Sequence, residues 1–205
     1  MSVLVTGATG FVGRRLLRLL DKPVVLSRDP ARAAREIGGL AARVVAWDPM
    51  RGPPPATAFE GVDTVMHLAG ESVADGRWTK ERKRRILETR SVGTRHLVQG
   101  IAQLAQRPTV LVSASAVGYY GNCGDEEVGE GHAPGDDFLA DVCVAWEKEA
   151  AAARDLGVRV VTARTGIALG AGGGALEKML LPFKLDRKST RLNSSHEWIS
   201  RMPSS

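Results

Sequence analysis

The first thirteen residues combine a short apolar run with three evenly spaced glycines. Residues 3–5 are apolar, as in a buried parallel strand. Gly7, Gly10 and Gly13 follow at three-residue intervals, and residues 11–20 have the apolar spacing of an amphipathic helix. A strand, a glycine-rich turn and a helix in this order predict a binding site for the pyrophosphate of a dinucleotide.

Each glycine has its own part in such a turn. Gly7 allows the tight turn, Gly10 lets the backbone approach the phosphates, and Gly13 lets the helix pack on the strand. The N-terminus of the helix adds free N–H donors and a partial positive charge. The alternative is an ordinary strand–helix turn with incidental glycines, but the flanking patterns favour a nucleotide site.

Further apolar runs repeat the strand signal along the chain. With the first, they cover residues 3–5, 24–26, 44–46, 62–67, 110–113 and 158–163. Helical patterns lie between most of them, at 11–20, 31–37, 78–106 and 137–156. This alternation predicts an α/β fold, a Rossmann-type doubly wound parallel sheet with right-handed crossovers. Prolines 53–55 replace the third crossover helix with a loop or a short turn.

Composition narrows the class of protein. A chain of 205 residues, 43% apolar, has the size and composition of one soluble α/β domain. No stretch approaches the ~20 apolar residues of a membrane span, and the chain enters a strand at once, so we expect no membrane anchor and no signal peptide. Two cysteines are too few for a disulfide scaffold, which favours a reduced cytoplasmic setting.

The net charge of +5 does not by itself indicate a nucleic-acid partner. The densest basic run covers residues 80–85 and lies beside apolar Ile86 and Leu87 in a helical pattern. It has no interleaved aromatic residues, so a solvated helix face is favoured over a phosphate-binding patch. We therefore expect a small-molecule substrate and no nucleic-acid partner.

The end of the second predicted strand bears on the choice of cofactor. An acid that reads the 2′-hydroxyl of NAD is expected there, but the strand is followed by Ser27 and Arg28. Arg28 can pair with a 2′-phosphate, and Ser27 can donate from its hydroxyl. NADP is therefore favoured over NAD. The alternative is that Arg28 is a surface cation and Asp29 reads a ribose.

Several motifs carry a family resemblance. The glycine turn has the spacing GxxGxxG, and the segments at residues 67–71, 77–79, 113–121 and 135–139 narrow the match. Together they resemble an atypical branch of the extended short-chain dehydrogenase/reductases, the NAD-dependent epimerase/dehydratase-like proteins of unassigned substrate. The resemblance covers residues 1 to about 185 in order.

The glycine turn, the end of the second strand and the resemblance together predict the cofactor site. The resemblance implies that residues 68–71 line the ribose and nicotinamide side of the cofactor. The predicted cofactor-binding residues are Thr6, Gly7, Thr9, Gly10, Phe11, Val12, Gly13, Ser27, Arg28, Leu68, Ala69, Gly70 and Glu71. No metal ligand is predicted.

The resemblance also shows that this sequence lacks two of the family's catalytic residues. The family uses a Tyr and a Lys four residues apart on a helix, aided by a Ser after the fifth strand. Ser115 matches the Ser, but the other two positions fall on Leu139 and Cys143. Leu cannot transfer a proton, and Cys cannot supply the cation. Tyr119, which follows the Ser segment, is the predicted substitute acid.

Other polar residues near the strand ends have two interpretations each. Tyr120 is a second candidate acid, and Arg90 is either a ligand contact or a surface salt-bridge residue. Arg164 is placed to reach a substrate, whereas Asp136 is favoured as a helix N-cap. His67 is favoured as a packed strand-end residue, because no partner for a general base is visible.

Two function classes follow. The first is an NADP(H)-dependent oxidoreductase of epimerase/dehydratase type acting on a small polar, sugar-like substrate. The second is a non-catalytic NADP-binding sensor or interaction module, suggested by the missing Tyr and Lys. Observing NADPH turnover with carbonyl compounds would discriminate between them.

The amino-acid composition and the apolar pattern of the sequence change after residue 185. Residues 186–205 contain no alanine and sustain no apolar period. We expect residues 1–185 to form a nucleotide-binding domain that lacks the family's C-terminal substrate lobe, and residues 186–205 to be an unstructured, non-native tail.

Overall fold

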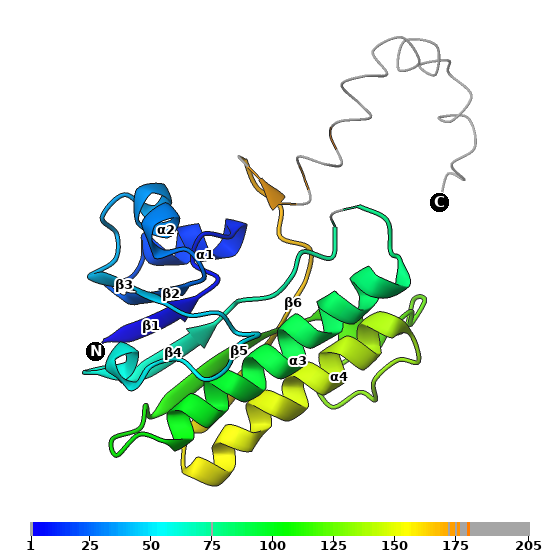
Figure 1. The fold of residues 1–205 in the computed structure, drawn as a ribbon. Helices are drawn as coiled ribbons and strands as arrows, with labels where there is room; N and C mark the ends of the chain where they lie inside the picture. Colours follow the sequence, from blue (N-terminus) through cyan, green and yellow to red (C-terminus); the bar gives the residue numbers. More distant parts are fainter. Residues whose placement is uncertain (1, 75, 172, 175, 177–179, 181–205) are drawn as a thin grey trace, which may run out of the picture. The chain divides into compact units, whose positions relative to one another are not determined.

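The computed structural model describes residues 2–74, 76–171, 173–174, 176 and 180 (Figure 1). The chain divides into two units, residues 1–166 and 167–205, and the first contains every helix and strand discussed below. The predicted boundary at residue 185 and the tail beyond it lie outside the described residues.

One parallel sheet forms the centre of the first unit. Its strands lie in the order β3-β2-β1-β4-β5-β6, and each neighbouring pair is parallel. The strands are β1 (Val3–Thr6), β2 (Val24–Ser27), β3 (Arg43–Ala46), β4 (Thr64–His67), β5 (Val110–Ala116) and β6 (Arg159–Thr165). The order reverses between β1 and β4, which confirms the predicted doubly wound fold and places a crevice at that reversal.

Helices cover both faces of the sheet (Figure 1). They are α1 (Phe11–Leu17), α2 (Pro30–Ile37), α3 (Lys80–Ala102) and α4 (Phe138–Ala151). The core on the α1 and α2 side contains Val5, Leu17 and Ile37, whereas Leu4, Leu97 and Ala150 belong to the core on the α3 and α4 side. Adjacent β1 side chains therefore enter opposite cores, as expected of a strand buried on both faces.

Local sequence signals set the helix boundaries. Asp29 caps α2 by accepting a hydrogen bond from Arg32 N at 2.9 Å, and Gly38 ends that helix with φ of +57°. The α3 helix begins after Thr79, whose hydroxyl accepts from Arg82 N. The α4 helix begins after Asp137, whose carboxylate accepts from Ala140 N at 2.9 Å.

The α4 boundary corrects one prediction. Asp136 was the expected N-cap, but Asp137 holds that position because its neighbour Phe138 is the first helical residue. The predicted extent of α4 was also too long: residues 152–156 form a 3₁₀ turn that ends at Gly157, with φ of +79°. Another 3₁₀ turn, Ala56–Phe59, follows the three prolines in place of a crossover helix. Across the described ranges, no helix is long and apolar enough to cross a bilayer.

Candidate functional site

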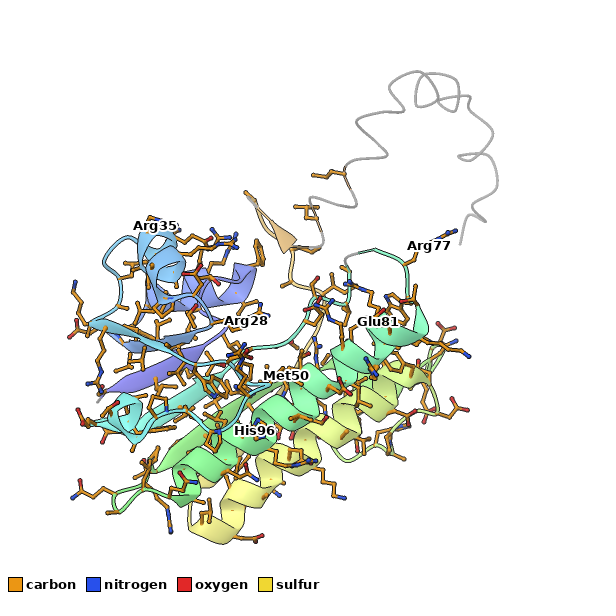
Figure 2. The ribbon with its side chains drawn as sticks, viewed as in Figure 1. Arg28, Arg35, Met50, Arg77, Glu81 and His96 are labelled. Atoms are coloured by element: carbon orange, nitrogen blue, oxygen red, sulfur yellow. The ribbon has the colours of Figure 1, made fainter. Side chains whose placement is uncertain are left out.

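A cavity of about 360 Å³ opens at the carboxyl ends of β1, β2 and β4. Its walls include ten of the thirteen predicted cofactor-binding residues: Thr6, Gly7, Thr9, Gly10, Ser27, Arg28, Leu68, Ala69, Gly70 and Glu71. Arg28 and Met50, both labelled in Figure 2, belong to this lining. The cavity lies where the strand order reverses, which is where open α/β sheets bind their ligands.

The glycine turn is shaped by close backbone contacts. Gly7 has φ of +68°, and a Cβ atom there would lie 2.7 Å from the Leu68 carbonyl carbon. A Cβ atom on Gly13 would lie 2.3 Å from the Gly7 carbonyl oxygen. Gly13 therefore packs α1 against β1, as its spacing predicts, and does not line the cavity.

Phe11 and Val12 also lie outside the cavity lining. The Phe11 ring packs under the Arg15 guanidinium, 3.7 Å from its centroid. The Val12 side chain is 47% exposed. The structure thus separates these two side chains and Gly13 from the other ten predicted residues.

The polar residues at the end of β2 differ in how many hydrogen bonds they make within the protein. The Asp29 carboxylate caps α2, and the Ser27 hydroxyl bonds with the Asp29 backbone. Arg28 is exposed, and it hydrogen-bonds none of the described residues. One oxygen of the Asp29 carboxylate is therefore used by the protein, and both Asp29 and Arg28 line the cavity.

A buried hydrogen-bond network supports the wall formed after β4. The Thr6 hydroxyl accepts from the backbone N–H groups of Leu68 and Ala69, each at 3.2 Å. With both lone pairs used, it donates its proton to His67 Nδ1 at 2.8 Å, so His67 Nε2 carries a hydrogen and donates to Thr94 at 3.0 Å. Burial lowers the pKa of His67 to about 4, so the ring is neutral at neutral pH. This placement confirms His67 as a packed residue.

Basic residues of α3 hold the next part of this wall. The Glu71 carboxylate forms ion pairs with Arg85 at 3.3 Å and Arg82 at 3.9 Å. The Glu71 backbone N–H donates to the Thr89 hydroxyl at 3.2 Å. The interpretation of residues 80–85 as a solvated face was therefore incomplete, because two of its arginines reach back to the cavity wall.

Ser115 belongs to a separate polar cluster at the carboxyl ends of β5 and β6. It is 2% exposed, and its hydroxyl donates to Glu147 Oε1 at 2.7 Å. Arg164 grips the same carboxylate through two nitrogens, at 2.8 and 2.9 Å. Burial raises the pKa of the Glu147 carboxyl, but the hydrogen bonds from Arg164 and Ser115 and the Arg164 charge give a net lowering. Glu147 is therefore held ionised.

The remaining contacts of Arg164 engage its third nitrogen. Its Nη1 donates to the Tyr120 hydroxyl at 3.0 Å and to the Glu130 carbonyl at 2.9 Å. The guanidinium carbon lies 3.4 Å from the centroid of the Tyr119 ring. All three nitrogens are engaged, through four of the five N–H groups, so Arg164 is held mainly by the protein rather than left free for a substrate.

The structure shows how the Ser115 hydroxyl is used. Its proton is directed at Glu147, so in this arrangement the hydroxyl is not free to donate to a substrate. Neither Ser115 nor Tyr119 lines the described cavity. Sequence reasoning missed Glu147, although it lies one helical turn after Cys143 on α4 and faces the Ser segment.

Leu139 and Cys143, at the two positions of the absent Tyr and Lys, have different surroundings. A Cβ atom on Gly118 would touch Leu139 Cβ at 3.3 Å, so Leu139 packs against the turn after β5. Burial raises the pKa of the Cys143 thiol, which keeps it protonated, and its sulfur lies 3.8 Å from the Ala116 carbonyl. Both cysteines are free. In the part of the chain that the structure describes, no three His, Cys, Asp or Glu side chains gather as metal ligands.

Comparisons with known proteins identify relatives of this chain. The family model described as NAD dependent epimerase/dehydratase family matches residues 3–193. Epimerase family protein YfhF of Bacillus subtilis is 35% identical over 205 residues, which cover 98% of this chain and 65% of the relative. Epimerase family protein SDR39U1 of Homo sapiens is 32% identical over 192 residues, covering 90% of this chain and 60% of the relative. The chain thus spans less than two thirds of these relatives' length.

Solved structures agree in fold. The human SDR39U1 structure, which contains NADPH, aligns with a TM-score of 0.72 at 33% identity, covering 90% of this chain and 60% of that one. A nucleoside-diphosphate sugar epimerase from Corynebacterium glutamicum aligns with a TM-score of 0.66 at 34% identity, covering 90% and 38%. With its glycine turn, doubly wound sheet and cavity at the strand reversal, this chain belongs to the NAD-dependent epimerase/dehydratase family, as an atypical short-chain dehydrogenase/reductase.

Proposed function

We propose that this chain binds NADP(H) and is the nucleotide-binding part of an epimerase/dehydratase-type oxidoreductase that acts on a small polar, sugar-like substrate. The observation that carries the proposal is the cavity at the reversal of strand order, with the glycine turn in its wall and the unpaired Arg28 beside it. A nicotinamide cofactor bound there would supply hydride transfer.

The residues present fit a dinucleotide. Gly7 and Gly10 line the cavity without side chains, which leaves room for phosphates to approach the backbone. Leu68 and Ala69 are held at the opposite wall by the Thr6 hydroxyl. The turn and the two walls provide a continuous surface from the end of β2 to the end of β4.

The preference for NADP(H) depends on the residues after β2. A free carboxylate would favour the 2′-hydroxyl of NAD, but one oxygen of Asp29 is taken by the cap of α2. Arg28 offers a planar cation that suits the charge and shape of a 2′-phosphate. The relative whose structure contains NADPH supports the same assignment.

The substrate half of the proposal depends on the family and on the β5 edge. Glu147 orients the Ser115 hydroxyl, and the Tyr119 ring packs against the guanidinium of Arg164, which binds the same carboxylate. We extend the proposal to a small-molecule partner and a cytoplasmic setting; two free thiols are consistent with that setting.

The test compares cofactor affinities of matched arginine variants. Arg28→Asp removes a charge-assisted pair and should cost about 1.5–3 kcal/mol of NADPH binding, with NADH binding unchanged or improved. Arg35→Asp makes the same charge change on the exposed surface of α2, outside the cavity lining (Figure 2). It should leave the preference for NADPH intact. Equal affinity of the parent protein for NADPH and NADH, measured by fluorescence titration, would contradict the assignment.

A further inference from the structure

Arg90 lies between the cavity wall and helix α4. Its Nη1 donates to the Glu71 carbonyl at 2.9 Å and to the Ile86 carbonyl at 3.2 Å. Its guanidinium carbon lies 5.0 Å from the centroid of the Trp146 ring. A Cβ atom on Gly70 would lie 3.1 Å from that carbon, so the glycine leaves the space that the guanidinium occupies.

The charge of Arg90 is not neutralised by the protein groups described. It forms no ion pair with a described carboxylate, because Glu71, its neighbour, directs its carboxylate to Arg82 and Arg85. Burial lowers the pKa of the Arg90 guanidinium, and the nearby Cys143 and Glu71 only oppose that shift. A partly buried cation without an anionic partner is costly, and such a group indicates a ligand contact.

Donors of Arg90 also remain unused. Both hydrogen bonds to described residues come from Nη1, and neither Nε nor Nη2 is among the buried nitrogens that lack a partner. These two nitrogens therefore have no hydrogen-bond partner among the described residues and are not fully buried. They form one edge of the guanidinium, which can donate to two neighbouring oxygens at once.

The position of Arg90 relates it to one half of a dinucleotide. A dinucleotide bound at the strand reversal has one nucleoside over β2 and the other over β4 and β5. Arg28 lies at the β2 side of the cavity, whereas Gly70 and Glu71, which contact Arg90, line it at the β4 side. Arg90 does not itself line the cavity, but it lies directly behind the Gly70–Glu71 wall, on the side opposite the proposed 2′-phosphate contact.

Cys143 of α4 carries no positive charge, so a cation in this half of the site has to come from another element. Cys143 occupies the α4 position at which a lysine was expected, and its thiol is close enough to Arg90 for each to affect the other's pKa. We propose that Arg90, carried by α3, holds the nicotinamide-side ribose of the bound cofactor, in place of a lysine on α4. This inference rests on the NADP(H) binding proposed above. The two adjacent hydroxyl oxygens of that ribose match the free edge of the guanidinium.

The experiment measures binding of two ligands to the full chain by calorimetry. NADPH occupies both halves of the site, whereas adenosine 2′,5′-bisphosphate occupies only the half near Arg28. Arg90→Met keeps a long side chain against Trp146 and removes the charge. It should weaken NADPH binding by about 10- to 100-fold and leave the bisphosphate affinity within about twofold.

Two further variants control for folding and for general charge effects. Arg84→Met removes an exposed arginine of the same helix, whose described ion pair is with Glu88, and should change neither affinity. Gly70→Ala adds a Cβ atom that displaces the Arg90 guanidinium while keeping its charge. It should weaken NADPH binding in the parent and add a smaller loss in the Arg90→Met background, because both changes remove the same contact.

The outcomes separate this inference from the function on which it rests. Equal weakening of both ligands by Arg90→Met, or no weakening of either, would overturn the role of Arg90 while leaving NADP(H) binding in place. Failure of the parent chain to bind either ligand would overturn the proposed function and this inference with it. A selective loss of NADPH affinity supports both.

Discussion

At the scale of single residues, most polar side chains at the strand ends are used by the protein itself. Thr6 supports the Leu68–Ala69 backbone, and Asp29 caps α2. Ser115 is held by Glu147. Arg28 and Arg90 differ, because neither has a carboxylate partner among the described residues. The two cations therefore mark where a ligand can complete the site.

His67 makes the stability of the fold depend on pH. Its pKa falls from 6.5 to about 4 on folding. Between these two pH values the ring is therefore protonated in the unfolded chain and neutral in the folded protein. The neutral ring's contribution is complete above pH 6.5 and is lost as the pH falls towards about 4. We expect a loss of roughly 3 kcal/mol over this window.

Urea unfolding across that window checks the prediction. His67→Asn keeps a hydrogen-bonding side chain without the titration, so its free energy of unfolding should vary less with pH. A parent and variant with the same pH dependence would assign the effect to another group.

At the scale of elements, two glycines of the β1–α1 turn have different tasks: Gly13 allows the helix to pack, and Gly10 lines the cavity. Gly13 is needed for packing, because a Cβ atom there would lie 2.3 Å from the Gly7 carbonyl oxygen and 2.7 Å from Ala8 Cα. Gly10 has one neighbour, the Gly7 carbonyl oxygen, at 3.2 Å from such an atom. It also lines the cavity, which Gly13 does not.

The matched variants Gly10→Ala and Gly13→Ala should therefore fail in different ways. Gly13→Ala should destabilise the fold by about 2 kcal/mol or more, because backbone atoms must move to admit the methyl group. Gly10→Ala should keep most of the stability and lose about tenfold or more in NADPH affinity, since the methyl group enters the phosphate space. Thermal unfolding and NADPH titration of both proteins test this, and retained binding in Gly10→Ala would remove the glycine turn from the site.

At the scale of the whole molecule, the first unit contains the sheet and every residue found to line the cavity. The sheet and both cores lie between residues 3 and 165, and the residues lining the cavity lie between Thr6 and Thr89. The β6 strand ends at Thr165, one residue before the end of this unit. Nucleotide binding should therefore be a property of residues 1–166.

A protein of residues 1–166 should fold cooperatively and bind NADPH within about twofold of the full chain. NADPH at 100 times its dissociation constant should stabilise both proteins by about 2.7 kcal/mol, because it binds the folded state. Differential scanning calorimetry with and without NADPH measures this. A shorter protein that folds but shows no stabilisation would assign part of the site to residues after 166.

The sequence by itself determined the alternation of strands and helices, the doubly wound fold and most of the cavity lining. These properties are local, since apolar runs, helical periodicity and glycine spacing are all read within a few residues. Such local patterns do not define helix ends to the residue: they favoured Asp136 as the cap of α4, and the structure has Asp137 there. Only the tertiary structure decided which polar groups are satisfied. Glu147 meets Ser115 across 32 residues and Arg164 across 17, and Arg90 contacts Glu71 across 19. Partners so distant in the chain come together only when the sheet forms, so no local pattern could show that Arg164 uses all three nitrogens within the protein and that Arg90 keeps donors free.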